Sequence, residues 1–161
     1  MKSSQGISNS KIISALIIIF AALALIWAFI FLFMGQSGTM AMKSAFVDVN
    51  GRKLTVEIAE TDKQRYKGLS DREALCADCG MLFNFPDSST RSFVMRDMRF
   101  PLDIIFIQDG VIKNIAGQLQ PEGSEPKNVY QSIEPVNQVL EVSGGYCEKN
   151  DIKPGDKIWI R

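Results

Sequence analysis

The hydrophobic positions of the chain follow two different patterns. Residues 12–34 form an unbroken run of 23 residues in which only Ser14 is not apolar. As a helix this run would measure about 34 Å, which is enough to cross a hydrocarbon core of about 30 Å. The run shows no polar residues at helical spacing, which a helix packed on a soluble core would need. The pattern therefore predicts a single transmembrane helix.

A cleaved signal peptide is the alternative interpretation of this run. The apolar region of a signal peptide is only about 7–15 residues long, so this run exceeds it. Thr39 and Ala41 do offer a weak small-x-small cleavage pattern. We favour a retained anchor, with residues 1–11 as a cytoplasmic N-terminus and residues 35–42 as a short flexible linker.

The distribution of positive charge predicts the orientation of this helix. Lys2 and Lys11 precede the run, whereas residues 35–42 carry no charge. The positive-inside rule therefore predicts a cytoplasmic N-terminus and a C-terminal domain, residues 43–161, on the periplasmic or extracellular side of the cell (inner) membrane.

Beyond residue 42 the pattern changes to short segments typical of β-strands. Asn50-Gly51 and Asp109-Gly110 separate pairs of these segments and predict tight hairpins. Thr61 and Gln64 form a capping box, which predicts one short helical excursion. The domain should therefore be mainly β, as a β-sandwich or partly closed barrel. The predicted strands cover 45–49, 54–58, 81–85, 92–96, 103–108, 111–119, 136–143 and 157–161.

Composition narrows the chemistry that this domain could perform. The chain contains no histidine, which excludes Ser-His-Asp and Cys-His catalysis and histidine-bearing zinc sites. Its 18 basic and 18 acidic residues cancel, whereas nucleic-acid-binding proteins normally carry a clustered basic surplus. We therefore expect no nucleic-acid partner, and nothing in the sequence calls for a cofactor or a metal.

The most visible motif is Cys76-Ala77-Asp78-Cys79. We favour an interpretation without catalysis or metal, in which the pair forms a short-loop disulfide or stays as two free thiols; disulfides persist outside the cytoplasm. A thioredoxin-like dithiol would require a βαβ context, and a zinc site would require four ligands when only Cys147 remains. Cys147 is expected either to be buried or to pair with one of the other two.

A second cluster of polar residues lies between two apolar segments. Two arginines and two aspartates fall within residues 96–103, and Pro101 prevents continuous strand pairing there. Arginine can hold an anionic or hydroxyl-rich ligand, and Asp103 could orient it. A structural ion pair between Asp103 and Arg65 or Arg96 is the competing interpretation. The candidate ligand-binding residues are Arg65, Met95, Arg96, Asp97 and Asp103.

Methionines accompany this cluster at positions 81, 95 and 98. Exported methionine clusters can bind Cu(I), because a thioether is a soft ligand. Core packing is the commoner role of methionine, and it is the one we favour.

The ordered segments of the domain resemble the DUF192 family of bacterial and archaeal proteins. The resemblance rests on 80–83, 92–96 and 101–107, on Arg65 with Gly68-Leu69 upstream, and on the closing segments around 139–144 and 152–156. It implies a mainly β fold in proteins that are often exported or anchored, and it brings no established activity. This chain has Val94 and 96–98 where the family usually has a tryptophan or similar residue and a Lys-Asn-Thr-like stretch. If residues 94–98 line a pocket, this difference in sequence implies that the chain binds a different ligand from that of other family members.

These observations favour a membrane-anchored, extracytoplasmic binding or accessory module for a small molecule. Two alternatives remain. An envelope hydrolase could use Asp97 and Asp103 as a pair of carboxylates, provided that the loop brings them to about 5–9 Å. A structural role would instead have the domain bind another envelope protein through an apolar face.

Overall fold

The computed structural model describes residues 9–34 and 42–161, which belong to two separate units. The first unit contains α1 (Asn9–Met34). Within the described part of the chain, no helix combines the length and the apolar character needed to cross a membrane. The structure does not describe the side chains at both ends of residues 12–34, so the transmembrane helix predicted there stays a prediction. The predicted cytoplasmic N-terminus and linker lie largely outside the described residues.

From Met42 onward the chain forms one unit that is mainly β. Two short helices, α2 (Asp62–Lys67) and α3 (Tyr146–Lys149), interrupt the strands. The first is the predicted helical excursion, and the second adds one turn of helix to it. The strands in chain order are β1 (Lys43–Val49), β2 (Arg52–Ala59), β3 (Cys79–Ser89), β4 (Ser92–Phe93), β5 (Leu102–Gln108), β6 (Val111–Leu119), β7 (Tyr130–Gln131), β8 (Val136–Ser143) and β9 (Ile158–Ile160).

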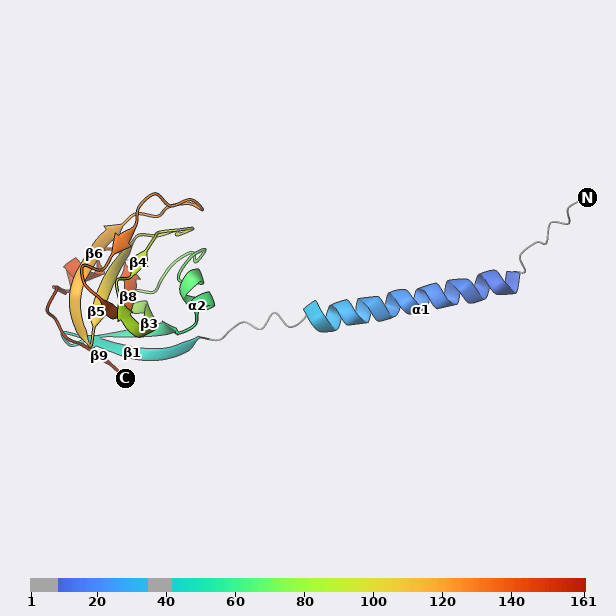
Figure 1. The fold of residues 1–161 in the computed structure, drawn as a ribbon, viewed down its shortest axis with the longest axis horizontal. Coiled ribbons are helices and arrows are strands. Elements are labelled where there is room, and N and C mark those ends of the chain that lie inside the picture. The colour runs from blue at the N-terminus through green and yellow to red at the C-terminus, as the bar shows by residue number, and fades with distance from the viewer. Residues whose placement is uncertain (1–8, 35–41) are drawn as a thin grey trace, which may run out of the picture. The chain divides into compact units, whose positions relative to one another are not determined.

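Seven of these strands form one sheet in the order β6-β5-β8-β3-β2-β1-β9, and β4 pairs with β7 in a small second sheet. The large sheet curls into a half-barrel (Figure 1). Its two edges approach each other where Ile158 donates its backbone N–H to Gly110 at 2.8 Å and Val111 bridges Lys157. The partly closed barrel is therefore the correct one of the two predicted architectures, and the sandwich is not.

The turn residues behave as their chemistry predicts. Asn50 and Gly51 adopt φ values of 51° and 79°, and Asp109 and Gly110 adopt 51° and 74°. Two consecutive residues with positive φ give the turn whose twist matches that of a β-hairpin. Both predicted hairpins, β1–β2 and β5–β6, are present.

The capping box at the start of α2 is also present. The Thr61 hydroxyl accepts the Gln64 N–H at 3.2 Å, and the Gln64 side chain accepts the Thr61 N–H at 2.9 Å. Gly68 follows with φ of 49°, and its N–H donates to the Gln64 carbonyl. These contacts fix both ends of a helix too short to be stable alone.

Burial on both faces is found in β5, in residues 80–83 of β3 and in residues 139–142 of β8, because two apolar clusters flank the sheet. On β5, Ile105 and Ile107 pack into one cluster, whereas Ile104 and Phe106 pack into the other. Alternation on a strand separates these neighbours onto opposite faces. Double burial explains why β5 reads as a continuous apolar segment rather than as an alternating one.

Candidate functional site

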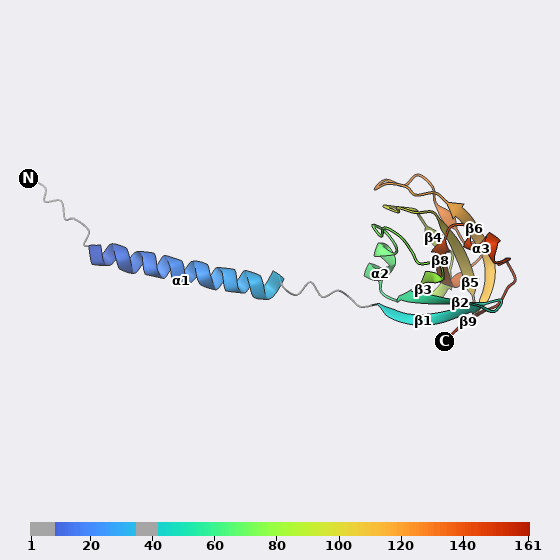
Figure 2. The same cartoon turned by 180° about the vertical axis from the view of Figure 1, so that it is seen from behind.

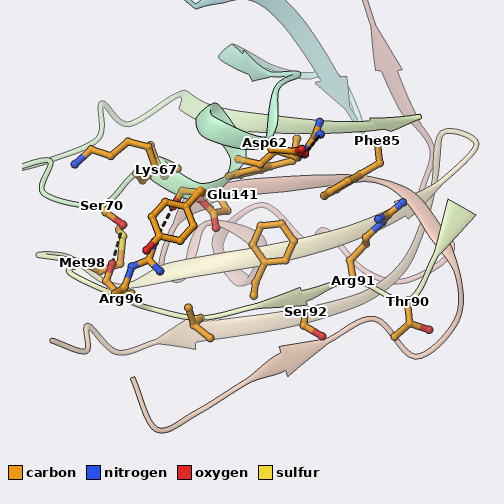
Figure 3. Close-up of a pocket in the computed structure, with 17 residues that line it drawn as sticks. Asp62, Lys67, Ser70, Phe85, Thr90, Arg91, Ser92, Arg96, Met98 and Glu141 are labelled. Carbon is orange, nitrogen blue, oxygen red and sulfur yellow. Dashed lines mark hydrogen bonds and ion pairs between the residues drawn. The ribbon is translucent and has the colours of Figure 1, made fainter. Parts of the chain in front are cut away.

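A cavity of about 510 Å³ opens on the face of the sheet that α2 covers. Its lining comes from α2 and the residues after it, from β3, from both sides of β4 and from β8. Figure 3 shows the side chains that surround it. The lining residues are Asp62, Arg65, Tyr66, Lys67, Gly68, Leu69, Ser70, Phe83, Phe85, Thr90, Arg91, Ser92, Phe93, Val94, Arg96, Met98 and Glu141.

Glu141 is the residue that distinguishes this cavity. It lies on the central strand β8, its side chain is 5% exposed, and Met81 and Ile104 stand beside it on β3 and β5. Its carboxyl makes no hydrogen bond or ion pair with any described residue. Burial in these apolar surroundings raises the pKa of Glu141 to about 8.

No side-chain oxygen or nitrogen of the described residues is both buried and unpaired, so the Glu141 carboxyl reaches the open cavity, where a matching group could bind it. Proteins keep such groups at functional sites more often than elsewhere. Because Glu141 faces a cavity large enough for a small organic molecule, the missing partner has room to enter.

Arg65 holds α2 against the sheet at one side of the cavity. Its Nη1 donates to the carbonyls of Glu60 at 2.6 Å and Asn84 at 2.7 Å, and its Nη2 contacts Asp62 at 2.6 Å. Both terminal nitrogens are therefore occupied by the protein. Arg65 shapes the cavity wall and leaves little donor capacity for a ligand.

Arg91 and Arg96 retain free donors. Arg91 donates from Nε to the Val136 carbonyl at 3.4 Å and from Nη2 to Asp87, and its guanidinium stacks 3.9 Å from the Phe85 ring. Arg96 donates from Nη2 to the Tyr66 backbone carbonyl at 2.7 Å, and its guanidinium lies 4.0 Å from the centroid of the Tyr66 ring. The Nη1 group of each arginine has no hydrogen-bond acceptor among the residues that the structure describes.

Aromatic side chains provide the apolar part of the lining. The Phe83 and Phe93 rings meet edge to face with centroids 5.0 Å apart, and Phe93 also contacts Phe106 at 6.1 Å. Such pairs fix ring orientation as well as burying apolar area. The cavity thus combines a rigid aromatic wall, two guanidinium groups with a donor to spare and one unpartnered carboxyl.

The residues predicted as a ligand site fall in two groups. Arg65 and Arg96 line the cavity, whereas Met95, Asp97 and Asp103 are absent from its lining. Met95 is fully buried, and its backbone carbonyl accepts the Glu122 amide at 3.0 Å. Since Asp97 and Asp103 do not share this cavity, the predicted pair of hydrolytic carboxylates is not brought together there.

Asp103 is buried, but its partners are not the arginines that the sequence suggested. Its Oδ1 accepts the backbone N–H groups of Gln118 at 2.7 Å and Gly145 at 2.9 Å, and its Oδ2 accepts that of Cys147 at 2.8 Å. The predicted ion pair with Arg65 or Arg96 is therefore wrong. Two of these bonds give acceptors to the backbone N–H groups at the start of α3, which lies beside β6 in Figure 2.

The sequence analysis missed Glu141, Arg91 and Phe85. For Glu141 a signal was available, because a charged residue interrupts the apolar segment 139–142 of a strand predicted to be buried. No comparable local signal marks Arg91, which lies in a polar stretch between two strands.

The cysteines and methionines lie apart from this chemistry. The structure joins Cys76 and Cys79 in a disulfide, while Cys147 is unpaired and buried. Met81, Met95 and Met98 belong to one buried apolar cluster, as core packing predicts. Among the described residues, 9–34 and 42–161, no group of three acidic, cysteine or histidine residues is placed so that it could hold a metal ion.

Comparison with known proteins agrees with the geometry of the domain. The model of the DUF192 family, described as "Uncharacterized ACR", matches residues 45–160. The chain belongs to the DUF192 family. No curated protein matches it in sequence.

Two crystal structures resemble this DUF192 domain. One is a protein from Sinorhizobium meliloti 1021 described as a candidate transcription regulator, with 32% identity and a TM-score of 0.71 over 76% of this chain and 98% of that one. The other is a protein of unknown function from Novosphingobium aromaticivorans DSM 12444, with 31% identity and a TM-score of 0.68 over 76% and 89%. They support the DUF192 fold and assign no activity to it.

The segment 94–98, where the family resemblance implied other residues, contributes to the site. Val94, Arg96 and Met98 all line the cavity.

Proposed function

We propose that this DUF192 domain is a binding module for a small organic molecule, which occupies the cavity beside Glu141. The observation that carries this proposal is Glu141, a residue that is only 5% exposed and whose carboxyl makes no hydrogen bond to the described protein and faces an open cavity. A volume of about 510 Å³ lies within the range of small-molecule sites. Aromatic walls with a few placed polar groups are typical of such sites.

A thermal-shift screen of the full-length protein in detergent tests this proposal. The panel would contain sugars, nucleotides, small carboxylates and phosphates, and short peptides. A ligand at a hundred times its Kd stabilises the native state by about 2.7 kcal/mol, which should raise Tm by several degrees.

Two matched variants locate the binding. Val94→Trp fills the cavity, whereas Val129→Trp makes the same change at an exposed residue that does not line it. We expect the shift to disappear only in Val94→Trp. A shift that survives in both variants, or no shift with any compound in the panel, would contradict the proposal.

We further propose that the module is held by a single-pass anchor, with a cytoplasmic N-terminus and the domain outside the cytoplasm. The unbroken apolar run 12–34 and the lysines before it support this arrangement. A reporter active only outside the cytoplasm, fused after Arg161, should be active in cells. Activity of a cytoplasm-only reporter at the same position would overturn the proposed orientation.

A second candidate function, binding to an envelope protein, has one observation in its favour. Phe46 and Trp159 are each 61% exposed, and with Lys53 and Arg161 they line a hollow of about 240 Å³ at the β1–β9 edge. Exposed aromatic residues beside an edge strand are typical of protein interfaces. Cross-linking in cells, compared between the wild type and Trp159→Asp, would reveal a partner that depends on this face.

A further inference from the structure

The donors left free in the cavity indicate which charge a ligand carries. Arg91 uses Nε and Nη2, and Arg96 uses Nη2, in bonds to the protein. Each keeps its Nη1 without an acceptor among the described residues. A guanidinium binds carboxylate and phosphate oxygens through such hydrogen bonds, which are stronger than those between neutral groups.

The balance of charge around the cavity points in the same direction. The charged and titratable groups that share the cavity with Glu141 are Asp62, Arg65, Tyr66 and Lys67 on α2, and Arg91 and Arg96 on either side of β4. The strands that flank Glu141 place only Met81 and Ile104 beside it. Each of the four basic groups already has an acidic partner: Asp62 for Arg65, Asp71 for Lys67, Asp87 for Arg91 and Asp97 for Arg96. Among the described residues that line the cavity, a cationic ligand would therefore meet no unpaired carboxylate as long as Glu141 is neutral.

The protonation state of Glu141 decides which ligand groups its carboxyl can bind. An anion beside an ionised Glu141 would be repelled, whereas a neutral carboxyl donates one hydrogen bond and accepts another. Burial raises the pKa of Glu141 to about 8, which keeps it neutral at pH 7. The O–H of a neutral carboxyl can donate to the carbonyl oxygen of a carboxamide, a hydrogen bond that an ionised carboxyl cannot make.

We infer that the cavity takes a small organic anion whose charged group binds Nη1 of Arg96 and whose carboxamide carbonyl accepts a hydrogen bond from the Glu141 carboxyl. This inference rests on the proposed function and adds the class of the ligand. An apolar or aromatic body of the ligand would pack against Phe83 and Phe93. N-acylated amino acids and the C-terminal residues of peptides carry these three groups together.

Equilibrium dialysis of the full-length protein, with the same detergent in both chambers, tests the charge of the ligand. The three probes are N-acetylphenylalanine, its uncharged amide N-acetylphenylalaninamide, and the cation phenethylamine. We expect the anion to bind at least about tenfold more tightly than either of the others. Arg96→Gln should weaken binding of the anion by a similar factor. Arg99→Gln, which removes a charge paired with Glu73 outside the cavity, serves as the control and should not change it.

The pH dependence tests the role of Glu141. Affinity for the anion should fall as the pH rises above about 8, because the carboxyl then ionises. Glu141→Gln stays neutral at every pH and should abolish that fall, and Glu141→Leu should weaken binding about tenfold at pH 7. Tightest binding of phenethylamine, or an affinity that rises with pH, would overturn the inferred ligand class and leave a binding cavity in place. No binding of any probe would also overturn the inference, while the proposed function is decided separately by the panel and Val94→Trp.

Discussion

The carboxylate of Asp103 accepts the backbone N–H of Cys147 at 2.8 Å, although the two residues are 44 positions apart. The same carboxylate accepts the N–H groups of Gln118 and Gly145. One fully buried side chain thus joins β5 to the end of β6 and to the start of α3. Its three acceptor contacts with backbone amides identify Asp103 as a structural centre of this end of the half-barrel.

Removal of this carboxylate should therefore destabilise the domain rather than alter the cavity. Asp103→Ala leaves three backbone donors without an acceptor, at about 1–3 kcal/mol for each buried group. We expect a loss of at least about 3 kcal/mol in the free energy of unfolding, measured by urea denaturation. Asp151→Asn, a change at an exposed aspartate, should stay within about 0.5 kcal/mol of the wild type. A stable Asp103→Ala variant that had lost only ligand binding would refute this assignment.

The features that could be predicted from the sequence are those set by neighbouring residues. Asn50 and Gly51 predict a hairpin because both residues readily adopt positive φ. Thr61 and Gln64 predict the start of a helix because each side chain hydrogen-bonds to the backbone of the other. Pro101 prevents strand pairing for the same local reason, and β5 begins at the next residue.

The features that could not be predicted depend on strand order. β8 lies between β5 and β3, an arrangement that no local pattern encodes, and this order brings Glu141 to the cavity. Arg65 and Arg96 were predicted as ligand-binding residues from their type, and both line the cavity. Asp103 was grouped with them only because it lies near Arg96 in sequence. The structure places its carboxylate among the backbone amides of other strands instead.

The cysteines give a prediction that needs no ligand. Cys76 and Cys79 form a disulfide, and Cys147 is 5% exposed with its pKa raised by burial. A thiol reagent should therefore find no reactive cysteine in the native protein, one in urea, and all three after reduction in urea. Mass spectrometry of the alkylated protein would count them. Two or more reactive thiols without reductant would contradict the disulfide.

Gly80 offers a test of the packing beside Glu141. A Cβ at this position would lie 2.7 Å from the Glu141 carbonyl oxygen and 3.1 Å from Leu140 Cδ1. Because the clash is with the backbone of a central strand, the neighbours have little room to adjust. Gly80→Ala should therefore cost about 1–3 kcal/mol, measured by urea denaturation. Gly123→Ala is the matched control, since a Cβ there meets nothing within 4 Å, and its stability should be unchanged.

The raised pKa of Glu141 makes stability depend on pH in a defined direction. The pKa is about 8 in the folded protein and 4.5 for the free side chain. Between these values the unfolded chain has lost the proton and the folded domain still holds it, so the domain binds more protons than the unfolded chain. This contribution to stability is fully present below pH 4.5 and is lost as the pH rises through 8.

In urea denaturation from pH 5 to 9, this group should lower the free energy of unfolding by about 1.4 kcal/mol per pH unit up to about pH 8. Glu141→Gln cannot ionise and should remove that slope, so that its advantage over the wild type grows with pH. Other carboxyls affect both proteins equally, and the difference between the two curves therefore isolates Glu141. Parallel curves would mean that the carboxyl is already ionised in the folded domain, and the cavity would then be expected to favour a cation.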